Sequence, residues 1–455
     1  MPIRTISGSQ IRYFLICFDK NGHEQTGDPD GINGLLSLRL LDEIRVEHPT
    51  NIFLFSHGWQ GDFPQAIDQY DRWIGAITSL HSYQSRQSAS IPGFKSMFVG
   101  IHWPSEPWGD EEMNMGSRSF GLGGTTAAEP LLQTYIRRLG DTPEIQDALR
   151  MIFDVARLNA DALTLPDEAG VAYRQLDRAL GLASKGTGAR PGEDRASFNP
   201  VQAFDEANSS EVADFGGWNL GGILAPLREL SFWTMKKRAN TVGEGGIHSL
   251  LNQMLSTSTS RLHLMGHSFG AIVMSSALVG PHGSSKLPRP VDSLVLIQGA
   301  LSLWAYSPDI PVEHGTSGYF HRIVKDGKVA GPIVTTRSTF DRAVCVFYPL
   351  AAGVGRQIEY GAAGQFPKYG GVGAFGIQGL PSNIEDRVMV DSNSEYSFGS
   401  GCIYNLDASK FICHGTGFAG AHSDIAGPEV AHVLWQAAES CSRTKTEKNI
   451  AESRI

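Results

Sequence analysis

The chain has 455 residues, of which 41% are hydrophobic and 19% are charged. This is the composition of a globular protein, and it argues against a disordered chain. With 38 Lys and Arg residues against 47 Asp and Glu residues, the formal net charge at pH 7 is -9. An acidic chain without clustered Lys and Arg lacks the basic surface that binds phosphate backbones, so we expect no nucleic-acid partner.

The cysteines and the N-terminal residues bear on the cellular compartment. The five cysteines are Cys17, Cys345, Cys402, Cys413 and Cys441. They are scattered and form no C-x-x-C pair, so we expect reduced thiols, no metal site and no cofactor. The first ten residues, MPIRTISGSQ, contain no apolar signal region, and no apolar run approaches the ~18 residues of a membrane span. We therefore expect a cytoplasmic protein without a membrane span; no feature of the sequence specifies an oligomeric state.

Short apolar runs bounded by turn residues recur along the chain, and helical patterns separate them. Runs such as FLICF, IFLF and LVLI are unbroken, which is typical of strands buried on both faces. The predicted strands cover residues 11–18, 51–55, 96–102, 261–265, 293–297, 332–336 and 402–406. The alternation predicts an α/β fold with a mainly parallel sheet flanked by helices. Residues 344–351 have the composition of a strand, but their place directly after a strand and loop favours a helix.

A segment of well over a hundred residues separates the strand at 96–102 from the helix before residue 261. It contains three helical patterns and then a stretch rich in Gly, Ser and Asp. We predict a helical insertion at 110–228 between two parts of one core, 1–109 and 229–455, because a compact domain does not carry so long a bare loop. We expect a lid that is mobile around residues 185–207, where few apolar residues can anchor the backbone. The alternative is that these helices extend the core or form an oligomer contact.

The most informative segment is RLHLMGHSFGAIVMSSAL. An apolar strand enters a G-x-S-x-G motif at Gly266, and a helix of small residues leaves it after Gly270. This is the context of a nucleophile elbow, a strained turn that lifts the serine hydroxyl above the sheet. The motif predicts that Ser268 is a nucleophile, beside a helix N-terminus that can stabilise negative charge. The alternative is a Gly-Ser turn that only connects two elements.

Together, the motifs FSHGW and GHSFG resemble those of the α/β-hydrolase superfamily of serine esterases, lipases and peptidases. The resemblance extends over the order of strands and helices from about Ile11 to Cys441, apart from the irregular insertions. It implies the α/β-hydrolase fold and a catalytic triad in the order serine, acid, histidine. The chain departs from the common plan because its large insertion follows the strand at 96–102, rather than the strand beyond the nucleophile helix.

The resemblance also implies two backbone N–H groups that would bind an oxyanion. One belongs to the residue after the nucleophile, which is Phe269. The other is expected from the loop after an early strand, where we assign it to Trp59, with the N–H of Gly58 as the nearest rival. His57 is expected to brace this loop rather than transfer a proton. Trp103 and Trp108 are expected to line the entrance to the site or to pack between insertion and core.

The remaining triad members follow from their positions after late strands. Asp341 is the candidate acid, in a loop between a strand and a helix, and its alternative role is to cap that helix. Asp309 is a rival, and Asp292 lies before a strand, where an acid of the triad is badly placed.

His422 is the candidate histidine because it follows the last predicted strand and a glycine-rich loop. His414 is the main rival, and His432 falls within the following helix. Asp424 is expected to brace the loop.

These assignments imply a serine hydrolase that forms an acyl-enzyme with a small-molecule acyl substrate, foremost a carboxylic ester. A peptidase or amidase, a thioesterase or an acyltransferase would use the same three residues. A binding protein that keeps the fold without the chemistry is a further alternative, since a fold alone does not prove activity.

Overall fold

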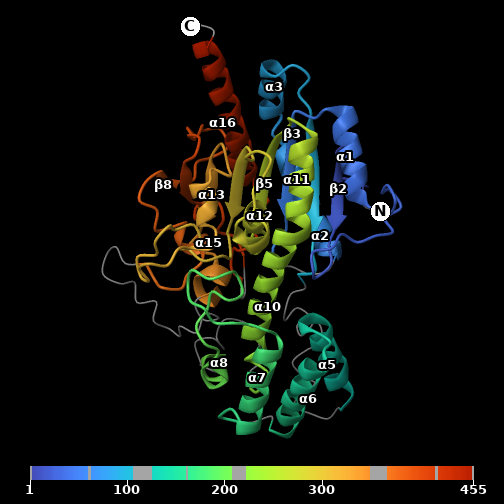
Figure 1. Cartoon of the computed structure of the whole chain (residues 1–455), viewed down its shortest axis with the longest axis vertical. Coiled ribbons are helices and arrows are strands. Elements are labelled where there is room, and N and C mark those ends of the chain that lie inside the picture. Colours follow the sequence, from blue (N-terminus) through green and yellow to red (C-terminus); the bar gives the residue numbers. More distant parts are fainter. Residues whose placement is uncertain are drawn as a thin grey trace.

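The computed structural model describes residues 3–59, 63–105, 125–159, 162–207, 222–348, 366–415 and 419–452. In these ranges, nine strands form one sheet in the order β1-β2-β4-β3-β5-β6-β7-β9-β8 (Figure 1). The strands are β1 (Ile3–Thr5), β2 (Arg12–Cys17), β3 (Asn51–Ser56), β4 (Ser96–His102), β5 (Arg261–His267), β6 (Ser293–Ile297), β7 (Ile333–Arg337), β8 (Ile384–Val388) and β9 (Ile403–Asp407). Only β1 is antiparallel to its neighbour; the other pairs are parallel.

Helices connect these strands and cover the sheet (Figure 1). The α-helices are α1 (Leu36–Glu47), α2 (Phe63–Ser79), α3 (His81–Ser90), α5 (Thr125–Leu139), α6 (Pro143–Leu158), α7 (Asp167–Ala179), α8 (Pro200–Ala207), α10 (Leu227–Val242), α11 (His248–Thr257), α12 (Gly270–Val279), α13 (His321–Lys325), α15 (Val372–Phe375) and α16 (Pro428–Glu452). Two π-helical turns, η1 (Gly243–Ile247) and η3 (Ala343–Phe347), and a short 3₁₀ turn, η2 (Pro281–Gly283), complete the described elements. Within the described ranges, no helix has the length and apolarity needed to cross a bilayer.

The two faces of the sheet are covered by different helices. Side chains alternate along a strand, so Leu54 of β3 belongs to one hydrophobic cluster and Phe55 to the other. The cluster of Leu54 includes residues of α1, α11 and α12, whereas the cluster of Phe55 includes residues of α2 and α16. Both faces of the central strands are therefore buried, which explains their unbroken apolar sequences.

The predicted α/β class with a mainly parallel sheet is confirmed, and each of the seven predicted strands has a counterpart in the sheet. Two strands were not predicted: β1 has three residues, and β8 carries charges in the sequence IEDRV. The helix expected at 344–351 begins as the π-helical turn η3, which ends at Phe347, and residues 349–351 lie outside the described part.

The helices α10, η1 and α11 follow one another without a break and form one long rod (Figure 1). The helices α5, α6, α7 and α8 gather around the end of the rod where α10 begins (Figure 1). Ile152 of α6 and Leu176 of α7 belong to the same hydrophobic cluster as Leu54 of β3. The helices expected within 110–228 therefore share a continuous apolar contact with one face of the sheet.

Part of the glycine- and serine-rich stretch is held by buried polar contacts. Asp194 accepts a 2.6 Å hydrogen bond from the ammonium group of Lys236 on α10, and both side chains are buried. Arg195 is also buried, pairs with Asp177 on α7 and donates to the carbonyl of Leu182 at 2.7 Å. Ion pairs therefore anchor Asp194 and Arg195, where apolar side chains are few, and the expected mobility of the stretch stays a prediction.

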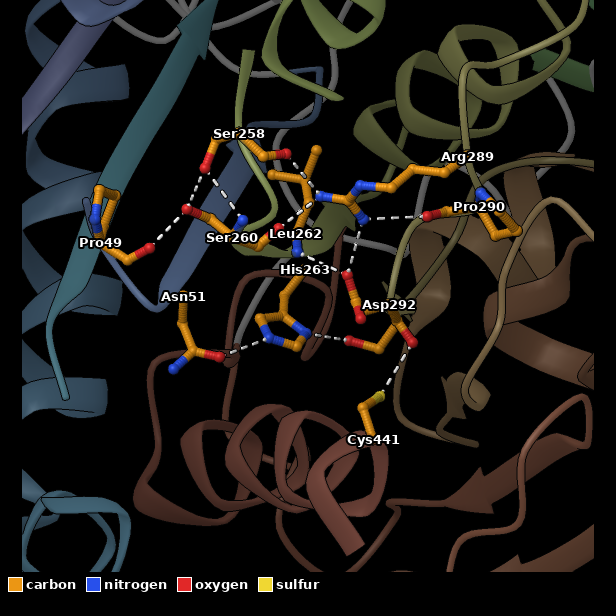
Figure 2. Close-up of polar contacts among 11 residues, drawn as sticks. Pro49, Asn51, Ser258, Ser260, Leu262, His263, Arg289, Pro290, Asp292 and Cys441 are labelled. Atoms are coloured by element: carbon orange, nitrogen blue, oxygen red, sulfur yellow. Dashed lines mark hydrogen bonds and ion pairs between the residues drawn. The ribbon is translucent and has the colours of Figure 1, made fainter. Parts of the chain in front are cut away.

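A hydrogen-bond network joins the first residues of the central strands (Figure 2). His263 on β5 lies between Asn51 on β3 and Ser293 on β6, with Nε2 3.1 Å from the Asn51 Oδ1 and Nδ1 2.8 Å from the Ser293 Oγ. Burial and, to a smaller extent, the charge of nearby Arg261 together lower the pKa of His263 to about 3. The ring is therefore neutral at pH 7, with Nε2–H donating to Asn51 and Nδ1 accepting from Ser293.

Asp292 belongs to the same network. Its Oδ2 accepts from the backbone N–H of Leu262 at 2.9 Å and from Arg289 at 3.3 Å (Figure 2). Its carbonyl accepts from the thiol of Cys441 on α16 at 2.9 Å. These contacts tie the starts of β5 and β6 to α16. Asp292 therefore lies at the amino ends of the strands, which is the end opposite Ser268.

Candidate active site

Ser268 lies in a sharp turn between β5, which ends at His267, and α12, which begins at Gly270. Its φ of 54° is in the left-handed region, where a residue other than glycine is strained by roughly 1–2 kcal/mol. A Cβ on Gly266 would lie 2.3 Å from the carbonyl oxygen of Gly270. A Cβ on Gly270 would lie equally close, at 2.3 Å, to the carbonyl oxygen of Ser56. Both glycines are therefore needed for the turn to close.

The backbone of Ser268 is fixed by the segment after β6. Its N–H donates to the carbonyl of Ile297 at 3.1 Å, and its carbonyl accepts from the N–H of Ala300 at 3.1 Å. The next N–H group, that of Phe269, donates to no carbonyl within the described ranges. A donor left open at the N-terminus of α12 is suited to a developing negative charge beside Ser268.

Asp341 and His422 form a buried hydrogen-bonded pair. The Oδ2 atom of Asp341 lies 2.8 Å from Nδ1 of His422. The Asp341 side chain is fully buried, and His422 is 7% exposed. Backbone contacts bring the two loops together, because Ala421 donates to the carbonyl of Phe340 at 2.8 Å. The sequence placed these residues 81 positions apart, and the fold joins them.

The Asp341 carboxylate has further donors. Its Oδ1 accepts from the N–H of Val344 at 3.0 Å, and its Oδ2 also accepts from Nε2 of Gln298 at 2.8 Å. The amide oxygen of Gln298 accepts from the hydroxyl of Thr336 at 2.9 Å, which fixes the amide orientation. The buried carboxylate is therefore hydrogen-bonded as an anion, as a charge in an apolar interior requires. The capping role considered for Asp341 coexists with its contact to His422.

His267 connects the elbow to the His422 loop. Its Nε2 lies 2.9 Å from the carbonyl of His422, its Nδ1 lies 3.2 Å from Nε2 of Gln69, and the two imidazole ring centres are 4.8 Å apart. Burial lowers the pKa of His267 well below its usual value, and His422 lowers it further. His267 is therefore neutral, donates through Nε2 and accepts through Nδ1. In the described part of the chain, no hydrogen bond joins the side chains of Ser268 and His422 directly.

The loop after β3 lies against the nucleophile. A Cβ on Gly58 would be 2.4 Å from the Cβ of Ser268, so only glycine allows this approach. His57 is buried and stacks on Trp103, with ring centres 5.7 Å apart. Its Nδ1 lies 2.9 Å from the carbonyl of Gly58, and its Nε2 accepts from the N–H of Trp103 at 3.4 Å. His57 braces the loop as expected.

The carbonyl of the Gly58–Trp59 peptide group faces the His57 ring. Burial lowers the pKa of His57 to about 3, with a further contribution from His102, so the ring is neutral and its Nδ1–H donates to Gly58. The described peptide bonds are all trans, so the N–H of Trp59 points away from the carbonyl of Gly58 and hence from the His57 ring. The hydrogen bond from neutral His57 therefore helps to fix the direction of the expected donor.

Aromatic side chains close over this part of the site. The rings of Trp59 and Phe269 are stacked with centres 5.7 Å apart. The ring of Phe232 on α10 packs against both: its centre lies 6.0 Å from the ring centre of Trp59 and 5.1 Å from that of Phe269. The start of the rod therefore lies directly over the elbow. Trp103 packs in the core against His57, and Trp108 lies outside the described residues.

The rival residues lie elsewhere or have other partners. Asp309 is exposed and pairs with His314 at 3.2 Å. His432, on α16, hydrogen-bonds Tyr83. His414 lies 3.2 Å from Asp424 and is largely exposed. Asp424 also accepts from the N–H groups of residues 413 and 414, so it braces its loop as expected. None of these contacts includes Ser268 or Asp341.

Two residues of the site were not singled out from the sequence. His267 occupies a variable position of the motif, and Gln298 directly follows a predicted strand. The second could have been found, because polar residues at the carboxyl ends of parallel strands point to a site. Gln298 also has a positive φ of 46°, which the sequence does not reveal.

The chain was compared with known proteins, and it matches no protein-family model, no curated protein and no solved structure.

Proposed function

We propose that the protein is a serine hydrolase with the α/β-hydrolase fold and that it acts on carboxylic esters through an acyl-enzyme. The observation that carries the proposal is the buried pair of Asp341 and His422 beside a strained serine turn. A carboxylate that fixes one nitrogen of an imidazole leaves the other free to accept a proton. Nothing in the network of Figure 2 has this combination.

In the proposed mechanism, the Oγ of Ser268 attacks the carbonyl carbon of the ester while His422 takes the hydroxyl proton. Asp341 holds the Nδ1–H of His422 and stabilises the imidazolium that forms. The tetrahedral adduct then expels the alcohol, which receives the proton from His422. Water, activated by the same imidazole, attacks the acyl-enzyme and releases the acid and free Ser268.

The oxyanion of each tetrahedral adduct needs two donors. We assign them to the N–H groups of Phe269 and Trp59, with Gly58 as the alternative to Trp59. The open N–H of Phe269 and the fixed direction of the Gly58–Trp59 peptide support this assignment. Removing one such donor typically costs about 100-fold to 1,000-fold in turnover.

We further propose that the helices of the insertion form a lid over the site. The helices α5 to α8 of the insertion gather around the start of α10, whose Phe232 contacts Phe269 and Trp59, and this arrangement supports the proposal (Figure 1). The anchored residues Asp194 and Arg195 restrict the motion to other parts of the insertion. A lid would exclude water and add apolar contacts to the acyl group.

The test is covalent labelling with a fluorophosphonate, followed by intact mass measurement. The wild type should gain one adduct, and Ser268→Ala should gain none. Ser275→Ala is the matched control, because Ser275 is a buried serine on α12 that hydrogen-bonds Tyr306. Equal labelling of wild type and Ser268→Ala would refute the nucleophile, and no labelling of either would favour an inert binding protein.

Ester, amide and thioester substrates with the same acyl group then separate the reaction classes. We expect the ester to be hydrolysed with the highest kcat/KM. Preference for the amide or the thioester would reassign the protein to an amidase or a thioesterase. Transfer of the acyl group to an added alcohol in preference to water would identify an acyltransferase.

A further inference from the structure

The loop that leads to His422 contains a second group of reactive side chains. Cys413, His414 and Asp424 each offer one ligand atom, and these atoms all lie within 4.8 Å of one another. It is the one such group of His, Cys, Asp and Glu side chains found among the described residues. The proposed chemistry of Ser268 uses none of the three.

Two of the distances can be compared with a zinc site. The Sγ of Cys413 lies 3.6 Å from Nδ1 of His414, which in turn lies 3.2 Å from Oδ2 of Asp424. In a regular tetrahedron with Zn–S near 2.3 Å and Zn–N or Zn–O near 2.0–2.1 Å, the S–N edge is about 3.5 Å and the N–O edge about 3.3 Å. These two spacings therefore match those of zinc ligands, and the thiol and the carboxylate lie within 4.8 Å of each other.

We propose that Cys413, His414 and Asp424 form a zinc-binding site whose fourth position is left to water or an added ligand. A thiolate, an imidazole and a carboxylate together favour Zn²⁺ over Mg²⁺ and Ca²⁺, which prefer oxygen ligands. On binding, the thiol proton of Cys413 passes to solvent and a Zn–S bond forms; nothing is oxidised or reduced.

The surroundings of the three side chains support this assignment. The N–H groups of Cys413 and His414 donate to Asp424 at 3.1 Å and 2.8 Å, and zinc-binding carboxylates are commonly held by such donors. The imidazole of His414 is 85% exposed, so an ion can reach it from solvent. The thiol makes two long contacts, 3.5 Å to the carbonyl of Lys410 and 3.6 Å to Nδ1 of His414, and a metal would readily replace the first.

A comparable pair elsewhere shows which feature is unusual. His314 and Asp309 also lie 3.2 Å apart in an exposed loop, but no cysteine joins them in a three-residue group. An exposed His–Asp contact is thus common to both loops. The loop at 413–424 differs because the thiol of Cys413 also lies 3.6 Å from the histidine nitrogen.

The site would link a metal to the proposed histidine. Asp424 lies two residues after His422, and Cys413 and His414 lie on the other arm of the same loop. An ion would therefore bridge the two arms of the loop. The binding site itself does not depend on the proposed hydrolase activity.

The experiment titrates Zn²⁺ into the full-length, metal-free protein against a chromophoric chelator, and Co²⁺ is used as the spectroscopic probe. The wild type should bind one equivalent of Zn²⁺, and Co²⁺ should give a thiolate charge-transfer band. Cys413→Ser and His414→Ala should each weaken Zn²⁺ binding by about 10-fold or more, since even partners outside the first shell have effects of that size. Cys413→Ser should also lose the thiolate band.

The controls are Cys402→Ser and His314→Ala, which remove a cysteine and an exposed histidine away from the site. Both should bind Zn²⁺ as the wild type does. Because Cys413 and His414 are near the surface, their variants should unfold at the same temperature as the wild type. The proposal is overturned by the absence of stoichiometric binding, by equal binding in Cys413→Ser, or by an equal loss in the controls. Fluorophosphonate labelling by Ser268 reports on the hydrolase separately.

Discussion

Strand β5 carries a buried histidine near each end, and the two histidines have different kinds of hydrogen-bond partner. His263 and His267 are four residues apart and therefore on the same face of the strand. Both are buried and neutral, because burial lowers the pKa of each. His263 contacts two side chains of neighbouring strands, whereas His267 contacts Gln69 on α2 and the backbone of the His422 loop.

The two ends of the strand differ in whether their hydrogen-bonding groups all have partners. Around His263 and Asp292, donors meet acceptors and bind the starts of the strands together (Figure 2). Beside His267, the N–H group of Phe269 donates to no carbonyl within the described residues, and Ser268 is held in a strained conformation. Burial and hydrogen bonding are common to both ends. The candidate site differs from the other end of the strand in its open N–H donor and its strained serine.

The largest expected effect comes from removing the proposed base. His422→Ala should lower kcat/KM for an ester by about 10,000-fold or more, because the serine proton then has no acceptor. His414→Ala, assayed in metal-free buffer, is the control and should keep the wild-type value. Steady-state kinetics check both. An inactive His414→Ala with an active His422→Ala would exchange their roles.

The two histidines of β5 should respond differently to the same change. His267→Leu removes the donor to the His422 carbonyl, so kcat should fall about 100-fold with little change in KM, as expected for a displaced catalytic group. His263→Leu should leave kcat unchanged. Both variants should lose about 1–3 kcal/mol in free energy of unfolding, because each leaves buried polar partners unpaired.

Rescue distinguishes positioning from general damage. His267→Gln retains an amide donor and should recover part of the lost kcat, while its stability is measured in parallel by urea unfolding. An equal loss of kcat in His263→Leu would show that the two ends of the strand are not separate in function.

The pH dependence of stability should weaken when a neutral histidine is removed. His263 has a folded pKa of about 3, below the unfolded value of about 6.5, so the unfolded chain binds the proton first as the pH falls. This contribution is present above pH ~6.5 and is lost towards lower pH. Between pH 7 and pH 5, the loss of unfolding free energy should be about 2 kcal/mol smaller in His263→Leu than in the wild type. Urea unfolding at both pH values measures it; equal losses would mean that His263 titrates normally.

The smallest expected effect concerns strain at the elbow. Ser268→Gly should be more stable than Ser268→Ala by about 1 kcal/mol, because glycine adopts a positive φ without a steric cost. Ser276→Gly is the control: Ser276 lies within α12, where glycine should instead destabilise the protein. Chemical denaturation of the three variants and the wild type measures the free energies of unfolding. Glycine should raise this free energy at position 268, relative to alanine, and lower it at position 276, relative to the wild type. A Ser268→Gly variant less stable than Ser268→Ala would indicate an unstrained turn.

The sequence predicted the central sheet because strands buried on both faces have unbroken apolar runs. It did not predict β8, because an edge strand with the sequence IEDRV has no such run. The polar contacts that anchor Asp194 were also not predicted. Its partner Lys236 lies 42 residues away in the sequence, and no local pattern predicts an ion pair between residues so far apart.

For the site, the sequence supplied the residues and the structure supplied their contacts. Ser268, Asp341 and His422 were chosen from their places after strands, and the fold brings Asp341 and His422 into contact. Their catalytic roles stay a prediction. The contributions of His267 and Gln298 depend on atoms meeting across the sheet, which the order of residues along the chain does not encode.

The π-helical turn η1 has a consequence for how the rod tolerates changes in length. Such a turn holds one residue more than a turn of α-helix, and the extra residue is contained within the bulge. The faces of α10 and α11 therefore keep their angular relation, with Phe232 over the elbow and Leu250 in the core. In an uninterrupted α-helix, one added residue would rotate everything beyond it by about 100°. Deleting the exposed Gly245 would thus shorten the rod while leaving its two halves in phase.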